Sequence, residues 1–253
     1  MTQLTWLAPW HSNPRSRPTL LCLPPAGSGC GQFRSWQDAL GDRVSVVGVQ
    51  LPGREARWRD PSPASVDDAV AAIVDEVRSL VSGQPLVVFG HSFGALLGYE
   101  VTRVLGNQYD AWPAALIVAA CRPPHMWIGA GHGLASDDDA LARLFNGRDL
   151  DDDELDEDSR ELFLAVLRKD TELSLTYRDP QRAPVRCQLW AWGGDRDDTV
   201  VASDLAEWQD YAAGEFTQRE FAGGHYFPGE RLDRVLQELD PLRSDSPLGG
   251  TLA

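Results

Sequence analysis

Short runs of aliphatic residues alternate along the chain with longer segments whose apolar positions recur at helical spacing. The clearest helix is predicted at 65–80, because its apolar residues fall on one face, and a last helix is expected around 230–239. Six runs are predicted to be strands: residues 19–23, 44–50, 85–89, 114–119, 187–192 and 216–221. Strands that alternate with helices form parallel sheets. The pattern therefore predicts an α/β protein with a mostly parallel central sheet and helices on both faces.

One long segment breaks this alternation. Residues 123–182 do not fit it, and we interpret them as an insertion into a core made of residues 1–122 and 183–243. Residues 244–253 are rich in Ser, Pro and Gly and are expected to form a flexible tail. A chain of 253 residues is long enough to bury the core of one large domain that carries such an insertion.

The insertion itself has a helical pattern. Two helices are predicted in it, at 137–145 and 159–175, on either side of the acidic run 149–158. Like charges repel one another and stay hydrated, so the favoured interpretation of this run is a solvated connector. A metal site is the less favoured alternative.

Composition narrows the functional classes. The net charge of -15 argues against a nucleic-acid partner, because phosphate binding needs concentrated Lys and Arg. The four cysteines lack CxxC spacing, which favours buried free thiols in a reducing compartment over a metal site. No apolar stretch reaches the roughly 18 residues of a membrane span, and the first residues lack the layout of a signal peptide. We therefore expect a cytoplasmic protein with no membrane partner.

The candidate chemistry begins at GHSFG, residues 90–94, which joins an apolar strand to an apolar helical segment. A serine between two glycines at such a turn has a strained backbone, and the glycines let strand and helix approach closely. The turn lifts the hydroxyl to a helix N-terminus, where backbone N–H groups face a developing oxyanion. This context predicts Ser92 as the nucleophile of an α/β-hydrolase fold, in preference to an ordinary turn serine.

A serine nucleophile needs a general base. In this fold the carboxylate and then the histidine follow the serine along the chain. His225 lies in the loop after the last predicted strand and fits that order. Among the other histidines, His11 precedes the predicted strands, His91 is inside the turn with the serine, and His125 and His132 fall in the insertion. His225 is therefore the predicted base.

The orienting carboxylate is expected in the turn after the strand at 187–192. Asp197 fits a G-x-x-D-x-x-V pattern, and the 28 positions from it to His225 accommodate one helix and one strand. Asp195 is the second candidate and Asp198 the third, since Asp also stabilises tight loops without any catalytic role.

The oxyanion needs two backbone donors. One is expected from Phe93, which follows the nucleophile, and the other from the loop after the strand at 19–23. Pro25 has no N–H, so Ala26 is the first candidate in that loop and Gly27 the second.

Together these motifs resemble the stand-alone type II thioesterases of polyketide and nonribosomal peptide pathways, within the α/β-hydrolase superfamily. The matching stretches are LCLPPAG at 21–27, QLPGREAR at 50–57, FGHSFGA at 89–95, RKD at 168–170 with Tyr177, GGDRD at 193–197 and GGHYF at 223–227. QLPGREAR is the discriminating stretch, because GxSxG occurs in esterases of every kind. The chain departs from the family pattern at Asp198, where a proline commonly follows the carboxylate.

The resemblance implies hydrolysis of acyl groups from the phosphopantetheine arm of an acyl or peptidyl carrier protein, which removes aberrant or stalled chains. It implies that residues 123–182 form a helical lid over the acyl site. We expect no cofactor and no metal. Arg54, Arg57 and Arg59 are candidates for docking the carrier. Two other functions stay open: a generic carboxylesterase or lipase acting on oxygen esters, and a hydrolase-fold binding protein without chemistry.

Overall fold

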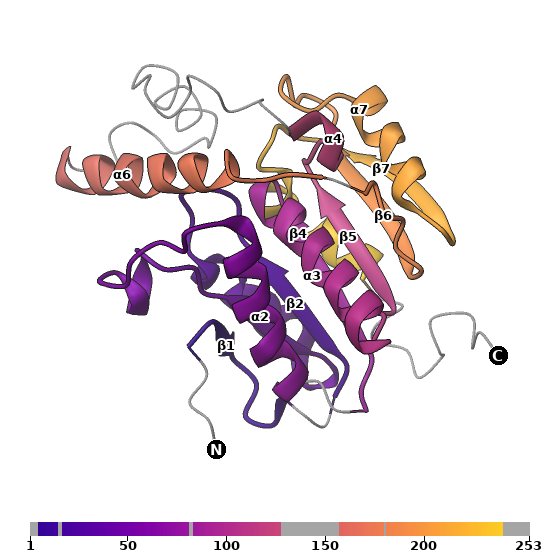
Figure 1. The fold of residues 1–253 in the computed structure, drawn as a ribbon, viewed down its shortest axis with the longest axis horizontal. Helices are drawn as coiled ribbons and strands as arrows, with labels where there is room; N and C mark the ends of the chain where they lie inside the picture. The colour runs from indigo at the N-terminus through magenta and orange to yellow at the C-terminus, as the bar shows by residue number, and fades with distance from the viewer. Residues whose placement is uncertain (1–4, 15–16, 81–82, 128–156, 180, 240–253) are drawn as a thin grey trace.

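The computed structural model describes residues 5–14, 17–80, 83–127, 157–179 and 181–239 (Figure 1). The predicted helix at 137–145, most of the acidic run and the predicted tail at 244–253 lie outside these residues. In the part of the chain that the structure describes, no helix is long and apolar enough to cross a bilayer.

The described residues form a seven-stranded sheet in the order β1-β3-β2-β4-β5-β6-β7. Its strands are β1 (Leu7–Pro9), β2 (Thr19–Leu23), β3 (Ser45–Val49), β4 (Leu86–His91), β5 (Ala115–Ala119), β6 (Gln188–Gly194) and β7 (Phe216–Phe221). All neighbouring strands pair in parallel except β1, which is antiparallel to β3. The predicted mostly parallel sheet is therefore confirmed, with strand ends that differ from the prediction by up to two residues.

Helices cover both faces of the sheet. They are α1 (Arg34–Leu40), α2 (Val66–Leu80), α3 (Phe93–Tyr109), α4 (Pro124–Trp127), α6 (Glu157–Ser174), α7 (Ala202–Ala206), α8 (Phe227–Glu230) and α9 (Leu232–Glu238). The first face packs against α2 and α3, which lie in front of the sheet in Figure 1, and the second packs against α1 and α9. α6 lies at the upper left of the same view, beside the end of the sheet at which α3 begins.

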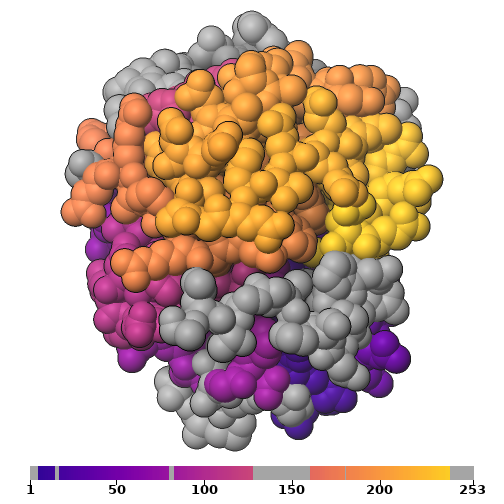
Figure 2. All heavy atoms as spheres, turned by 90° about the vertical axis from the view of Figure 1, so that its right-hand side faces the viewer, coloured from indigo at the N-terminus to yellow at the C-terminus, as the bar shows by residue number. Residues whose placement is uncertain are grey.

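The continuous apolar runs seen in the sequence are the central strands. Every residue of β2, β4 and β5 is buried, because helices cover both faces of a parallel sheet. β7 lies at the outer edge, and most of its side chains are half-buried or exposed. The face in Figure 2 is formed largely by β7 and the other segments after residue 185, in orange and yellow. The catalytic candidates follow the carboxyl ends of β2, β4, β6 and β7, which share one edge of the sheet.

Two elements near the N-terminus escaped the sequence analysis. β1 has three residues, too few for a periodic signal, and it is held from outside: the Glu76 carboxylate on α2 accepts the backbone N–H groups of Thr5, Trp6 and Leu7. The second is α1, which follows a single 3-10 turn. Because β1 precedes His11, the expectation that this histidine lies ahead of the strands is wrong.

Candidate active site

Ser92 sits at the junction of β4 and α3 with φ 53° and ψ -120°. A positive φ is strained for a residue with a side chain and is of the order of 1–3 kcal/mol less favourable than an ordinary conformation. The Ser92 N–H donates to the Ala119 carbonyl at 2.8 Å, which ties the turn to the neighbouring strand β5. The backbone geometry expected of a nucleophile turn is thus present at Ser92.

The two flanking glycines are required by close backbone contacts. A Cβ on Gly90 would lie 2.3 Å from Cα of Ala95, and one on Gly94 would lie 2.3 Å from the Leu23 carbonyl oxygen. The first contact lets the strand and the helix meet at the turn. The second brings the first turn of α3 against the loop after β2, so Ser92 and that loop lie side by side.

Gly94→Ala is expected to lower the free energy of unfolding by about 3 kcal/mol, because its methyl group would clash with the carbonyl oxygens of Leu23 and Pro24. Urea denaturation of wild type and variant measures the difference. Gly229→Ala is the matched control, since its Cβ meets nothing within 4 Å and its backbone is not strained. Equal losses in the two variants would contradict the packing argument.

His225 and Asp197 are hydrogen-bonded to each other. His225 Nδ1 lies 2.7 Å from Oδ2 of Asp197, whose side chain is fully buried, while the imidazole is 21% exposed. A carboxylate only accepts, so the contact places the imidazole proton on Nδ1 and leaves Nε2 as the acceptor. Of the three candidate aspartates, the structure brings Asp197 to the histidine.

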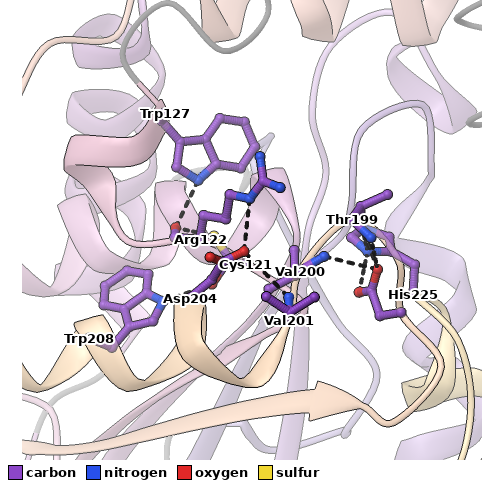
Figure 3. A network of polar contacts seen from close by, with 10 residues as sticks. Cys121, Arg122, Trp127, Thr199, Val200, Val201, Asp204, Trp208 and His225 are labelled. Atoms are coloured by element: carbon purple, nitrogen blue, oxygen red, sulfur yellow. Dashed lines mark hydrogen bonds and ion pairs between the residues drawn. The ribbon is translucent and has the colours of Figure 1, made fainter.

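Thr199 completes the carboxylate's surroundings, and the sequence analysis missed it. Its backbone N–H and its hydroxyl donate to Asp197 Oδ1 at 2.8 and 2.6 Å, and the Val200 N–H donates to the same oxygen at 3.1 Å (Figure 3). The hydroxyl also lies 3.0 Å from His225 Nδ1. The signal was in the sequence, because an Asp two residues before a Thr commonly accepts its backbone N–H in a turn.

These contacts set the ionisation of Asp197. Burial alone would raise the pKa of its carboxyl, but the hydrogen bond and charge of His225, together with the Thr199 hydrogen bonds, lower that pKa to about 2. The carboxyl of Asp197 therefore stays ionised at every pH at which the protein would work.

This pKa predicts a pH-dependent stability. The folded pKa lies below the ordinary value of 3.8, so ionised Asp197 stabilises the fold above about pH 4, by about 2 kcal/mol, and this contribution is lost as pH falls through 2. We expect the unfolding free energy of wild type to exceed that of Asp197→Asn by a margin that narrows by about 1 kcal/mol between pH 5 and pH 3. Urea titrations at the two pH values test this, and a constant or widening margin would count against it.

The other two aspartates lie elsewhere. Asp195 is exposed, and its Oδ1 accepts the Gly223 N–H at 3.0 Å, which holds the loop that carries His225. Asp198 is exposed too. Close approach of that loop also depends on Gly194, where a Cβ would lie 2.3 Å from the Gly224 carbonyl oxygen.

The remaining described histidines have structural contacts. His91 Nε2 donates to the backbone carbonyl of His225 at 2.7 Å, so its ring supports the histidine loop. His11 lies 3.4 Å from Asp42. His125 stacks on the Tyr211 ring, and the two centroids are 6.0 Å apart. His132 falls outside the described residues.

A cavity of about 490 Å³ opens at this edge of the sheet. Ser92, Phe93, His225 and Ala26 all line it, and α4 and α6 supply further walls that include Trp127 and Leu167. Among the described bonds, none involves the N–H of Ala26 or Phe93, whereas the Gly27 N–H donates to Asp170 at 2.7 Å. Gly27, the second candidate for the oxyanion donor, is therefore already engaged.

A second polar network fixes the cavity wall after β5 (Figure 3). The Trp208 indole N–H donates to the Cys121 carbonyl at 2.7 Å, and Trp127 donates to the Arg122 carbonyl at 2.9 Å. Arg122 in turn pairs with Asp204 on α7 at 3.1 Å. The segment that follows β5 is thereby tied to Asp204 on α7 and to Trp208 just after it.

Of the three arginines predicted to dock the carrier, Arg54 is not available at the surface. It is only 8% exposed and binds Asp170 through both terminal nitrogens, at 2.5 and 2.6 Å. Arg57 is also largely covered, because it pairs with Asp60 and donates to the Gln50 carbonyl. Arg59 alone of the three is exposed. Among the described residues, no group of three or more His, Cys, Asp or Glu is arranged to hold a metal ion.

The parallel sheet, the strained serine turn after β4 and the histidine loop after the last strand define an α/β-hydrolase. The family model for the thioesterase domain matches residues 18–242. The chain belongs to the thioesterase family, and it is a serine hydrolase that acts on thioesters.

Individual proteins that are similar to this chain are thioesterases as well. The thioesterase PikA5 of Streptomyces venezuelae is 30% identical over 239 residues, which cover 92% of this chain and 84% of the relative. The RedJ thioesterase from the prodiginine pathway of Streptomyces coelicolor has a TM-score of 0.80 at 34% identity, over 89% of this chain and 85% of that one. The type II thioesterase BorB from the borrelidin biosynthetic cluster has a TM-score of 0.84 at 28% identity, over 94% of this chain and 98% of that one. The resemblance to type II thioesterases is confirmed.

Proposed function

We propose that Ser92, His225 and Asp197 are the nucleophile, the general base and the orienting carboxylate of an acyl-thioester hydrolase. One observation carries this proposal: the 2.7 Å contact between His225 and Asp197 lies beside a cavity that Ser92 and His225 both line. The strained backbone at Ser92 and the membership of the thioesterase family support the same assignment.

The reaction proceeds in two halves. Ser92 Oγ attacks the thioester carbonyl while its proton passes to His225 Nε2, and the amide N–H groups of Ala26 and Phe93 receive the oxyanion. The tetrahedral intermediate collapses, the C–S bond breaks, and the departing thiolate takes the proton from His225. Water then gives its proton to the same imidazole and attacks the acyl-Ser92 ester, which releases the acid and restores the serine.

The substrate is an acyl group on the phosphopantetheine arm of an acyl or peptidyl carrier protein. The enzyme removes aberrant or stalled chains during polyketide or nonribosomal peptide biosynthesis. RedJ and BorB, which come from a biosynthetic pathway and a biosynthetic cluster of this kind, support this reading. All four cysteines are buried and free, which suits a cytoplasmic location.

The helices of the insertion form a lid over the acyl site in this proposal. α4 and α6 both belong to residues 123–182, and both contribute side chains to the cavity wall. Core residues at 1–122 and 183–243 supply the three reacting side chains and both oxyanion donors.

The experiment that tests the function follows acyl groups on carrier proteins directly. A panel of carriers loaded with different acyl groups is incubated with the enzyme, and intact mass reports loss of each acyl group. We expect conversion to the free thiol form for at least part of the panel. For the same acyl group, kcat/KM on the carrier thioester should exceed that on a p-nitrophenyl ester by about tenfold or more, a difference of about 1.4 kcal/mol.

Two outcomes would support the alternatives. A preference for the oxygen ester would indicate a carboxylesterase or lipase. A protein that turns over neither substrate and gains no mass from a fluorophosphonate probe would be a binding protein without chemistry.

A further inference from the structure

The loop that carries Ala26 is a tight turn. The Ser28 N–H donates to the Pro25 carbonyl at 3.1 Å, and Gly27 has φ +75°, the value that the third position of a type II turn requires. The Pro25 carbonyl and the Ala26 N–H belong to one planar peptide and point in opposite directions. Holding that carbonyl inside the turn therefore fixes the direction of the Ala26 N–H.

Two buried side chains hold this turn. The Asp170 carboxylate on α6 accepts the Gly27 N–H at 2.7 Å, and Arg54 Nη1 donates to the Ser28 carbonyl at 3.1 Å. The two side chains bind each other through both oxygens and both terminal nitrogens. Two side chains 116 positions apart thus bond to the same loop, at the peptide before Gly27 and the peptide after Ser28.

Every donor of the Arg54 guanidinium is used. Nη1 binds Ser28 and Asp170, Nη2 binds Asp170 and the Pro52 carbonyl, and Nε binds the Pro52 carbonyl. Five N–H groups in one plane leave the side chain a single orientation, which a lysine cannot reproduce.

Glu55 holds the next residues of the same loop. Its carboxylate accepts the N–H groups of Cys30 and Gly31, at 3.1 and 2.8 Å. A Cβ on Gly29 would lie 2.2 Å from the carboxylate oxygen, so the glycines of this loop make room for the contact. QLPGREAR and RKD, two stretches of the family resemblance, therefore meet at one loop.

A buried ion pair is weak evidence for stability, because apolar residues of the same size stabilise a fold equally well. This pair instead bonds to the backbone on either side of Gly27. On the basis of the proposed function, we infer that Arg54 and Asp170 are positioning residues for the Ala26 oxyanion donor. They make the geometry of that donor depend on where α6 lies.

Conservative variants test the inference. Arg54→Lys keeps the charge and loses the planar fork, and Asp170→Asn keeps one acceptor for Gly27. For each, kcat on an acyl thioester is expected to fall about 10- to 100-fold with KM within about threefold, less than the 10²- to 10³-fold loss caused by removing an oxyanion donor. Asp170→Ala should lose more than Asp170→Asn, since no acceptor remains.

Tyr177→Phe is the matched control. The Tyr177 hydroxyl donates to buried Glu100 at 2.9 Å, just beyond the end of α6, and its contact is with α3. We expect this variant to lose thermal stability and keep kcat within about twofold of wild type. If its kcat falls as far as that of Arg54→Lys, or if the Arg54 and Asp170 variants change only KM, the inference is wrong.

A second readout separates this inference from the proposed function. Attack of Ser92 on a fluorophosphonate forms an O–P bond, breaks the P–F bond and places negative charge on the phosphoryl oxygen, whatever the natural substrate. The Arg54 and Asp170 variants should label about tenfold more slowly than wild type or Tyr177→Phe. If no thioester is hydrolysed but labelling shows this difference, the proposed function fails and the inference stands. Labelling at the wild-type rate overturns the inference.

Discussion

Ser92→Ala is expected to lower kcat on acyl-carrier thioesters by about 10⁴-fold or more, the loss measured when the nucleophile of a triad is removed. The reason is covalent: without Oγ no acyl-enzyme forms, and water in the cavity must attack the thioester directly. KM should change little, because the methyl group leaves the cavity wall and the peptides of Ala26 and Phe93 in place. Single-turnover assays at enzyme excess are sensitive enough for such a loss.

An exposed serine gives the comparison. Ser79, near the end of α2, bonds only to the Glu76 carbonyl among the described contacts, and Ser79→Ala should retain wild-type kcat. Peptide mapping after fluorophosphonate treatment should find the adduct on Ser92 and none in Ser92→Ala. Retention of full turnover by Ser92→Ala would remove the serine from the mechanism.

Asp197→Asn is expected to cost about 10⁴-fold in kcat at neutral pH with the fold intact. The cause lies in Oδ1, which accepts three hydrogen bonds from Thr199 and Val200. Those donors require the carbonyl oxygen of the asparagine at that position, so its NH₂ group must face His225 Nδ1. The imidazole then has to present Nδ1 as an acceptor and carry its proton on Nε2, where it can no longer accept the proton of Ser92.

The neighbouring aspartates supply the controls for this prediction. Asp198→Asn should keep kcat within about threefold, because the side chain is exposed. The kcat of Asp195→Asn should lie between those of Asp197→Asn and Asp198→Asn, since the Asp195 carboxylate holds Gly223 in the histidine loop. A loss in Asp198→Asn or Asp195→Asn larger than that in Asp197→Asn would reassign the carboxylate. Steady-state assays of the three purified variants decide the order.

The parts of the site that the sequence predicted are those governed by local pattern and chain order. Continuous apolar runs located the central strands, and GHSFG located the strained turn because both glycines are needed beside Ser92. Chain order selected His225, and spacing selected Asp197 over Asp195 and Asp198. Each of these signals lies within a short stretch or follows from the order of the elements.

Other contacts depend on tertiary packing that no local pattern reveals. The sequence predicts Arg54 at the surface, either as a docking residue or as an ordinary solvated side chain, because arginine is rarely fully buried unless it is paired. Its partner Asp170 is 116 positions away, on α6, and only the packed structure brings the two together. β1 was missed for a similar reason, because Glu76 of α2 and the neighbouring strand β3 hold the three residues of this edge strand in place.

The positive φ at Ser92 bears on the choice of an inactive enzyme for trapping complexes. Alanine has a Cβ and is strained at positive φ just as serine is. Ser92→Ala should therefore melt close to wild type and keep the wild-type conformation of the turn when a loaded carrier is bound. Glycine adopts positive φ without penalty, and Ser92→Gly should therefore be the more heat-resistant of the two inactive forms. A higher melting temperature of Ser92→Gly would show that the backbone conformation at residue 92 serves the reaction at the expense of stability.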